Sequence, residues 1–234
     1  MKTRHLLLLI FCFSTSLSAM GLRSFVALPV EKNGVVLRVQ NLYTKETEQN
    51  VLLTSLAYGI NAKQTLLFGT SYTTNPIHKT GDISLLYRYI ISQNDIYEGT
   101  SRFALLGGAL LPTKSDSGTA MQAGAVYSYF FNKHEIDIDG LYILGENKRK
   151  NSAKYDISWQ YRVLPETRDD WGISKELYSV VEYNGKWANQ QITTQELTLG
   201  LQLIFPKFVL EAGYTKALTQ QKYSKYLISI RTHF

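Results

Sequence analysis

Polar and apolar side chains alternate along many segments of this 234-residue chain. The clearest case is KYDISWQYRV, residues 154–163, where Tyr155, Ile157 and Trp159 are separated by polar residues. A period of two is the period of a β-strand, so each segment has one face toward an apolar environment and one toward water. After residue 21 no apolar run approaches the roughly 20 residues of a membrane-spanning helix. If the chain crosses a membrane, it does so as a β-barrel.

Twelve alternating segments follow one another, separated by turn-rich links. They cover residues 35–43, 51–60, 65–73, 82–92, 102–111, 121–131, 135–142, 154–163, 177–187, 197–205, 208–215 and 223–234. An even number of strands is typical of single-chain outer-membrane barrels. We therefore predict an all-β fold, a closed antiparallel transmembrane β-barrel of about 12 strands. The alternative from the same alternation is a soluble β-sandwich.

The last segment ends on the final residue of the sequence. Tyr226, Ile228 and Ile230 alternate with polar residues, and Phe234 closes the segment. A closed barrel pairs its last strand with its first and leaves no free edge. This ending resembles the terminal signal of bacterial outer-membrane barrels. We predict that Tyr226, Ile228, Ile230 and Phe234 form an assembly signal for the barrel-assembly machinery.

The beginning of the chain has the layout of a secretory signal peptide. A basic head precedes an apolar run from Leu6 to Phe13, and small residues follow to Gly21. The run is too short to span a bilayer, although an N-terminal membrane anchor is the alternative. We expect residues 1–21 to be a cleaved signal peptide, residues 22–34 an N-terminal lead that plugs the lumen, and residues 35–234 the outer-membrane barrel. The only cysteine, Cys12, lies in the segment to be removed.

Charge and link lengths predict partners and orientation. The formal charge of +6 is a mild excess and does not indicate nucleic acid. Short turns at 60–63, 132–134 and 206 are expected on the periplasmic side, and longer links at 74–81, 113–119, 144–152 and 217–223 outside. The links after the fourth and eighth segments are longer than this scheme predicts. The outside links carry Lys79, Lys114, Lys148, Arg149, Lys150 and Lys222, which would face outer-membrane lipid and lipopolysaccharide, or simply water.

Charged residues occupy the polar faces of the segments, and in a barrel these faces line the lumen. The lumen-facing candidates are Asp82, Arg88, Arg102, Asp137, Asp139, Asp156, Arg162, Glu182, Glu211 and Arg231. They either contact a small-molecule solute or pair with one another and rigidify the barrel, because unpaired buried charges are costly. An inward apolar strip of Leu86, Ile90, Leu106 and Leu110 either carries apolar solutes or packs beneath a plug formed by residues 25–30.

Enzymatic and metal sites find little support in the sequence. Outer-membrane hydrolases need a serine beside a histidine base, and His78, His134 and His233 lie in no such motif. His134 precedes Glu135, Asp137 and Asp139, but alternate strand positions do not converge as metal ligands do. We expect no catalytic residue, no metal and no cofactor.

Several short motifs resemble one known family. They are SLAYGINAKQTLLFGTSY at 55–72, TGDISLLYRYI at 80–90, LLGGALLPTKS at 105–115, VVEYNGKW at 180–187 and the closing Phe234. These are similar to the outer-membrane β-barrel family named after the meta-pathway of phenol degradation. The family's glycine after Pro-Thr is Lys114 here. The resemblance implies a transporter-like barrel that passes small hydrophobic or aromatic compounds.

The combined sequence features predict a channel or transporter-like barrel in the outer membrane of a Gram-negative bacterium. The alternative is a non-conducting barrel that serves as a surface anchor or adhesion scaffold.

Overall fold

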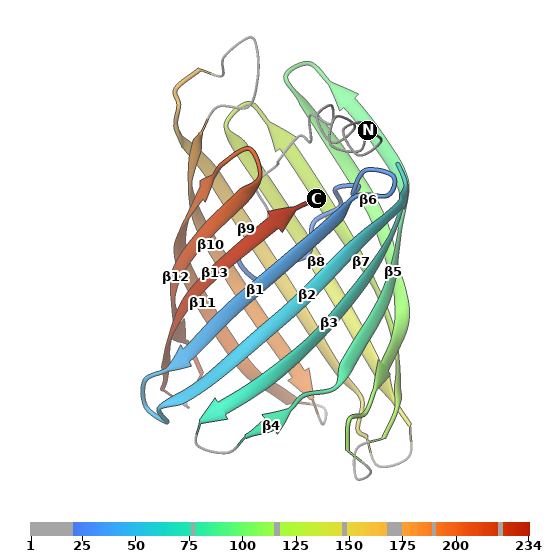
Figure 1. Cartoon of the computed structure of the whole chain (residues 1–234), viewed down its shortest axis with the longest axis vertical. Helices are drawn as coiled ribbons and strands as arrows, with labels where there is room; N and C mark the ends of the chain where they lie inside the picture. Colours follow the sequence, from blue (N-terminus) through green and yellow to red (C-terminus); the bar gives the residue numbers. More distant parts are fainter. Residues whose placement is uncertain are drawn as a thin grey trace, which may run out of the picture.

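In the computed structural model, β-strands wind around a common axis as a barrel (Figure 1). The structure describes residues 21–75, 78–114, 118–146, 149–167, 175–188, 191–219 and 222–234. The strands are β1 (Val35–Thr44), β2 (Gln49–Asn61), β3 (Gln64–Asn75), β4 (Lys79–Thr80), β5 (Ile83–Ile96), β6 (Gly99–Leu111), β7 (Ala120–Phe131), β8 (His134–Gly145), β9 (Ser152–Leu164), β10 (Glu176–Ala188), β11 (Gln191–Ile204), β12 (Phe208–Ala217) and β13 (Ser224–His233). The predicted signal peptide lies outside the described residues, except for Gly21.

The barrel is closed by its first and last long strands. β1 pairs antiparallel with β13 from Val36 opposite His233 to Thr44 opposite Lys225. Beyond this register, the amide of Val35 donates to the carbonyl oxygen of Phe234 at 3.0 Å, and the Phe234 amide donates back at 2.9 Å. The predicted closed barrel of twelve antiparallel strands is therefore confirmed. The two-residue β4, which pairs with β3 inside a link, is an addition to the prediction.

The barrel has an apolar outside and a polar inside. Large hydrophobic side chains on the outer face are exposed, among them Leu199, Leu201 and Ile228. Polar side chains of the same strands, such as Gln160, Glu182 and Gln202, are fully buried inside. This arrangement is the inverse of a soluble protein, and it suits a barrel surrounded by lipid.

Among the described residues there is no helix long and apolar enough to cross a membrane.

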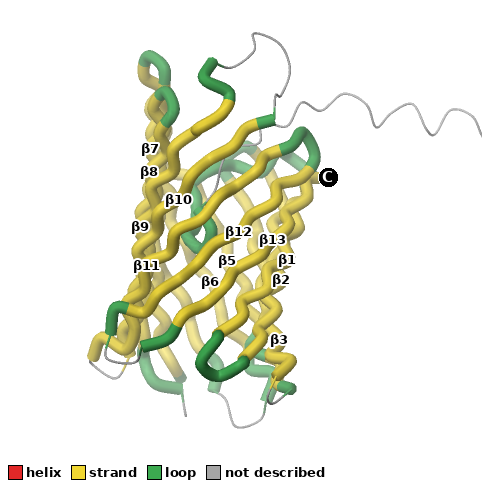
Figure 2. The backbone as a smooth tube through the Cα atoms, turned by 90° about the vertical axis from the view of Figure 1, so that its left-hand side faces the viewer, coloured by secondary structure: helices red, strands yellow, loops and turns green. Residues whose placement is uncertain are grey.

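The two ends of the barrel differ in their links (Figure 2). The start of β1 and Phe234 lie at one end, which we call the terminal end, together with tight turns at 62–63, 97–98 and 132–133. The opposite end, which we call the loop end, carries the links 76–82, 112–119, 146–151 and 218–223, whereas the longest link, 165–175, belongs to the terminal end. The long link predicted after the fourth segment is wrong, because β5 and β6 both extend beyond the predicted segments and leave a two-residue turn. The link after the eighth segment is long, as predicted, and spans 165–175.

The lead lies inside the barrel rather than outside it. Leu22, Val26 and Ala27 are at most 1% exposed. Phe25 and Ala27 pack against Ile90, Ala104 and Val126 of the inner wall. The lead and the inner wall therefore form one packed unit, which determines the shape of the lumen.

Candidate functional site: the lead and the cavity in the lumen

The carboxylate of Glu182 on β10 binds the start of the lead. The Arg23 amide donates to both carboxylate oxygens, at 3.1 Å and 3.0 Å. The Ser24 amide and hydroxyl donate to the same carboxylate, at 3.3 Å and 3.0 Å. Glu182 is fully buried, so these charge-assisted hydrogen bonds replace its lost hydration. Two residues further along β10, Asn184 accepts from the Arg23 guanidinium at 3.3 Å.

Other strands hold the next residues of the lead. The Phe25 amide donates to Asp139 of β8 at 2.7 Å, and the Ala27 amide donates to the Ser128 hydroxyl of β7 at 2.8 Å. Arg88 of β5 donates to the carbonyl oxygen of Val26 at 2.5 Å and also to that of Leu28. The main chain of the lead is thus satisfied by side chains of the wall, as buried backbone groups require.

The lead also contacts β1 and two glycines, Gly200 of β11 and Gly213 of β12. Arg38 and Gln40 both donate to the carbonyl oxygen of Leu22, the latter at 3.0 Å. A Cβ atom added at Gly200 would lie 2.3 Å from the Leu22 side chain, and one at Gly213 would lie 3.1 Å from it. Only glycine leaves room at position 200 for the leucine to sit against the wall.

Ion pairs fill much of the remaining inner wall. Glu211 lies 2.7 Å from Arg38 and 3.6 Å from Arg231, and Arg162 lies 3.8 Å from Glu176. These pairs agree with the alternative in which lumen charges pair with one another.

Toward the loop end, Glu196 joins the lead to β13. It pairs with Arg23 and, at 2.6 Å, with Lys225, and it accepts from the Tyr223 hydroxyl at 2.7 Å. Partial burial, together with this carboxylate, raises the pKa of Tyr223 above its ordinary value. The Tyr223 hydroxyl acts as the donor to Glu196.

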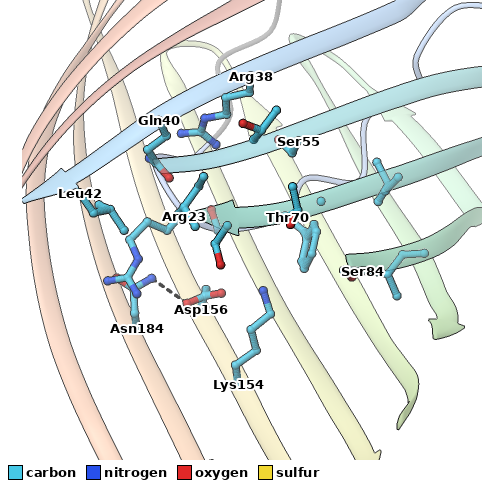
Figure 3. Close-up of a pocket in the computed structure, with 18 of the residues that line it drawn as sticks. Arg23, Arg38, Gln40, Leu42, Ser55, Thr70, Ser84, Lys154, Asp156 and Asn184 are labelled. Carbon is cyan, nitrogen blue, oxygen red and sulfur yellow. Dashed lines mark hydrogen bonds between the residues drawn. The ribbon is translucent and has the colours of Figure 1, made fainter. Parts of the chain in front are cut away.

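A cavity of about 690 Å³ remains between the lead and the wall formed by β2 and β3. Small side chains of that wall, Ser55, Ala57, Gly69 and Ser71, leave this space open. Across the cavity stand Arg23 of the lead and Lys154, Asp156 and Asn184 of β9 and β10 (Figure 3). The volume lies in the range of cavities that hold small molecules, about 300–1,000 Å³.

The ten charged candidates divide into two groups. Eight of them have buried side chains inside the barrel: Arg88, Asp137, Asp139, Asp156, Arg162, Glu182, Glu211 and Arg231. Asp82 is partly exposed and pairs with Arg149 at the loop end. Arg102 is partly exposed near the terminal end, where it donates to Gln93 at 3.2 Å.

Those eight do not form one cluster. Asp139 and Glu182 hold the lead from β8 and β10, whereas Arg88 holds it from β5. Glu211 and Arg231 pair on the adjacent strands β12 and β13. Arg149, one of the basic residues predicted on the outside links, pairs with Asp82 and donates to the Gly118 carbonyl oxygen at 2.7 Å. Lys148 lies outside the described residues.

The apolar strip is largely covered by the lead. Leu86 and Leu106 form a buried cluster with Leu141, against which Phe25 packs. Ile90 packs with Ala27 in a second cluster. Leu86 is the member of the strip that also borders the cavity.

Histidines and carboxylates show no arrangement of a metal site in the described part of the chain, where no group of three or more His, Cys, Asp or Glu side chains could hold an ion. His134 faces Trp159, whose indole donates to it at 3.2 Å, and its ring also contacts Tyr161. His78 lies 3.4 Å from the Tyr72 hydroxyl.

The sequence did not identify several of the residues that build the site. Arg23 and Ser24 are missing from the prediction because the lead has no period that places it in the lumen. Ser128 and Asn184 share the parity of the charged candidates, so the alternation was the signal that could have found them.

No protein-family model matches the chain, and no curated protein matches it by sequence. Solved structures do match its fold. The NanC porin aligns with a TM-score of 0.59 at 14% identity, over 84% of this chain and 98% of the porin. An outer-membrane channel from Pseudomonas putida F1 aligns with a TM-score of 0.57 at 14% identity, over 89% and 97% of the two chains.

At this identity the likeness concerns the fold, a closed β-barrel of the outer-membrane type. Taken with the apolar outer surface of the barrel, it agrees with a location in the bacterial outer membrane.

Proposed function

We propose that this barrel is an outer-membrane channel that passes small solutes through its lumen and has no catalytic role. The observation that carries the proposal is the cavity of about 690 Å³ beside the lead. A barrel that served only as a rigid anchor would gain nothing from a partly open lumen lined by small side chains. Twelve strands enclose less space than the 16 to 18 of an open porin, which favours a selective passage.

The lead is the element that narrows this passage. It occupies the lumen through hydrogen bonds to six strands of the wall, and it covers most of the inward apolar strip. We propose that solutes pass between the lead and the small side chains of β2 and β3. The apolar part of the lining admits solutes with a hydrophobic or aromatic portion, which is the cargo class that the family resemblance implies.

The proposal predicts that purified protein makes lipid vesicles permeable to small solutes. Swelling of vesicles in isotonic solutions of graded solute size measures this permeability. We expect the fastest swelling with solutes of amino-acid size and slower swelling with disaccharides, because the lead occupies part of the lumen and narrows the path. Vesicles that hold correctly folded protein but remain impermeable to every solute would support the surface-anchor alternative instead.

A further inference from the structure

Two lysines on neighbouring strands line the cavity. Lys154 on β9 and Lys186 on β10 are direct cross-strand partners in the antiparallel register, and both line the cavity. Like charges directly opposite each other on neighbouring strands are destabilising. Within the described residues, no ion pair joins either ammonium group to a carboxylate.

The other cations of the lining already have partners. Arg23 and Lys225 pair with Glu196, and Arg38 and Arg231 pair with Glu211. The lining holds six basic and three acidic side chains, and a fourth carboxylate, Glu211, pairs with Arg38 and Arg231 of the lining. The remaining formal excess of two positive charges gives the cavity a field that attracts anions.

An apolar surface adjoins the two lysines. The Lys154 ammonium lies 4.3 Å from the centre of the Phe25 ring. Phe25 and Leu67 both pack against the buried cluster that contains Leu86. In Figure 3 the Lys154 side chain extends into the cavity beside Asp156. Lys186 is exposed, near the loop end of β10, so it is reached first by a solute that enters from that end.

We propose that Lys154 and Lys186 form a binding site for a small organic carboxylate with an apolar body. The carboxylate would lie between the two ammonium groups and relieve their repulsion, and the apolar body would lie against Phe25, Leu67 and Leu86. This inference rests on the proposed function, since it names the solute class of the same lumen. The two lysines assigned to binding are the basic side chains of the lining that form no ion pair among the described residues.

Benzoate is the probe, and equilibrium dialysis against the full-length barrel in detergent is the measurement. Lys154→Gln and Lys186→Gln should each weaken benzoate binding about tenfold, the typical effect of losing one charge-assisted hydrogen bond. Lys63→Gln, an exposed lysine in the turn at 62–63, is the matched control and should leave binding unchanged. Benzyl alcohol, which is neutral and similar in size, should bind weakly and with no dependence on either lysine.

Heat-modifiable migration on a gel shows that each variant is folded before its binding is compared. Benzoate binding that is absent in the parent protein, or equal in the parent and in both lysine variants, would overturn the site. Vesicle swelling with the same preparations separates this result from the proposed function. A permeable barrel with no lysine-dependent binding refutes the site alone, whereas lysine-dependent binding in an impermeable barrel refutes the channel alone.

Discussion

Leu199→Arg should lower the free energy of unfolding by about 2–4 kcal/mol, the cost of an arginine on the lipid face near the bilayer midplane. Leu199 is 51% exposed in the barrel and lies in the central part of β11, opposite Val181 of β10 and Tyr214 of β12. Its outward direction puts a substituted guanidinium into the hydrocarbon. Urea unfolding of the protein in lipid vesicles measures the change.

The matched control is Ala57→Arg, which adds the same side chain on the inside. Ala57 lines the open cavity and its cross-strand partners Val36 and Leu67 carry no charge, so the new guanidinium remains in water, and we expect a change within about 0.5 kcal/mol. Ser158 would be a poor control although the alternation makes it inward-facing. It is fully buried between Asp137 and Glu182, so it does not face open water. Equal destabilisation by the outer and the inner arginine would show that the outer face is not in lipid.

Deletion of Phe234 should greatly reduce the amount of folded barrel in the outer membrane and leave degradation products in the periplasm. The deletion removes both hydrogen bonds between Val35 and Phe234 at the closing seam. It also removes the last residue of the predicted assembly signal. Quantification of the heat-modifiable band in outer-membrane fractions measures the yield.

Phe234→Tyr is the matched control for the deletion. It keeps the main-chain hydrogen bonds and an aromatic ring, so its yield should stay close to that of the parent. A normal yield without Phe234 would contradict its role in assembly.

Much of this fold could be predicted because lipid and lumen impose opposite polarity on alternate residues. The eight polar and charged candidates that are buried inside the barrel were assigned by parity alone. The same parity places Ile157 and Leu201 on the outer face. The order of the strands needs no further information, since each segment pairs with its neighbour and the last pairs with the first.

The ends of some strands could not be predicted from this signal. β5 contains an irregularity between Ile90 and Ser92, which interrupts the alternation. The part of β5 from Ser92 to Ile96 is mostly polar, so the sequence predicts a loop there.

The alternation also could not predict that the lead lies inside the barrel. Its residues do not form a strand, and its main chain is held by side chains of several different strands, among them Glu182, Asp139 and Arg88. A sequence period describes neighbours along the chain and cannot show contacts of this kind. The cavity depends on the same placement, because the lead forms one of its walls.

Single-channel recording after chemical modification of one engineered cysteine tests most directly whether the lumen is the solute path. Ser55→Cys in a chain with Cys12→Ser places the only thiol in the cavity wall, and Leu52→Cys places it on the outer face. A bulky, positively charged methanethiosulfonate reagent should reduce the current through the Ser55→Cys protein and leave the Leu52→Cys protein unchanged. Equal currents before and after modification at position 55, or no current from the folded parent protein, would contradict the account.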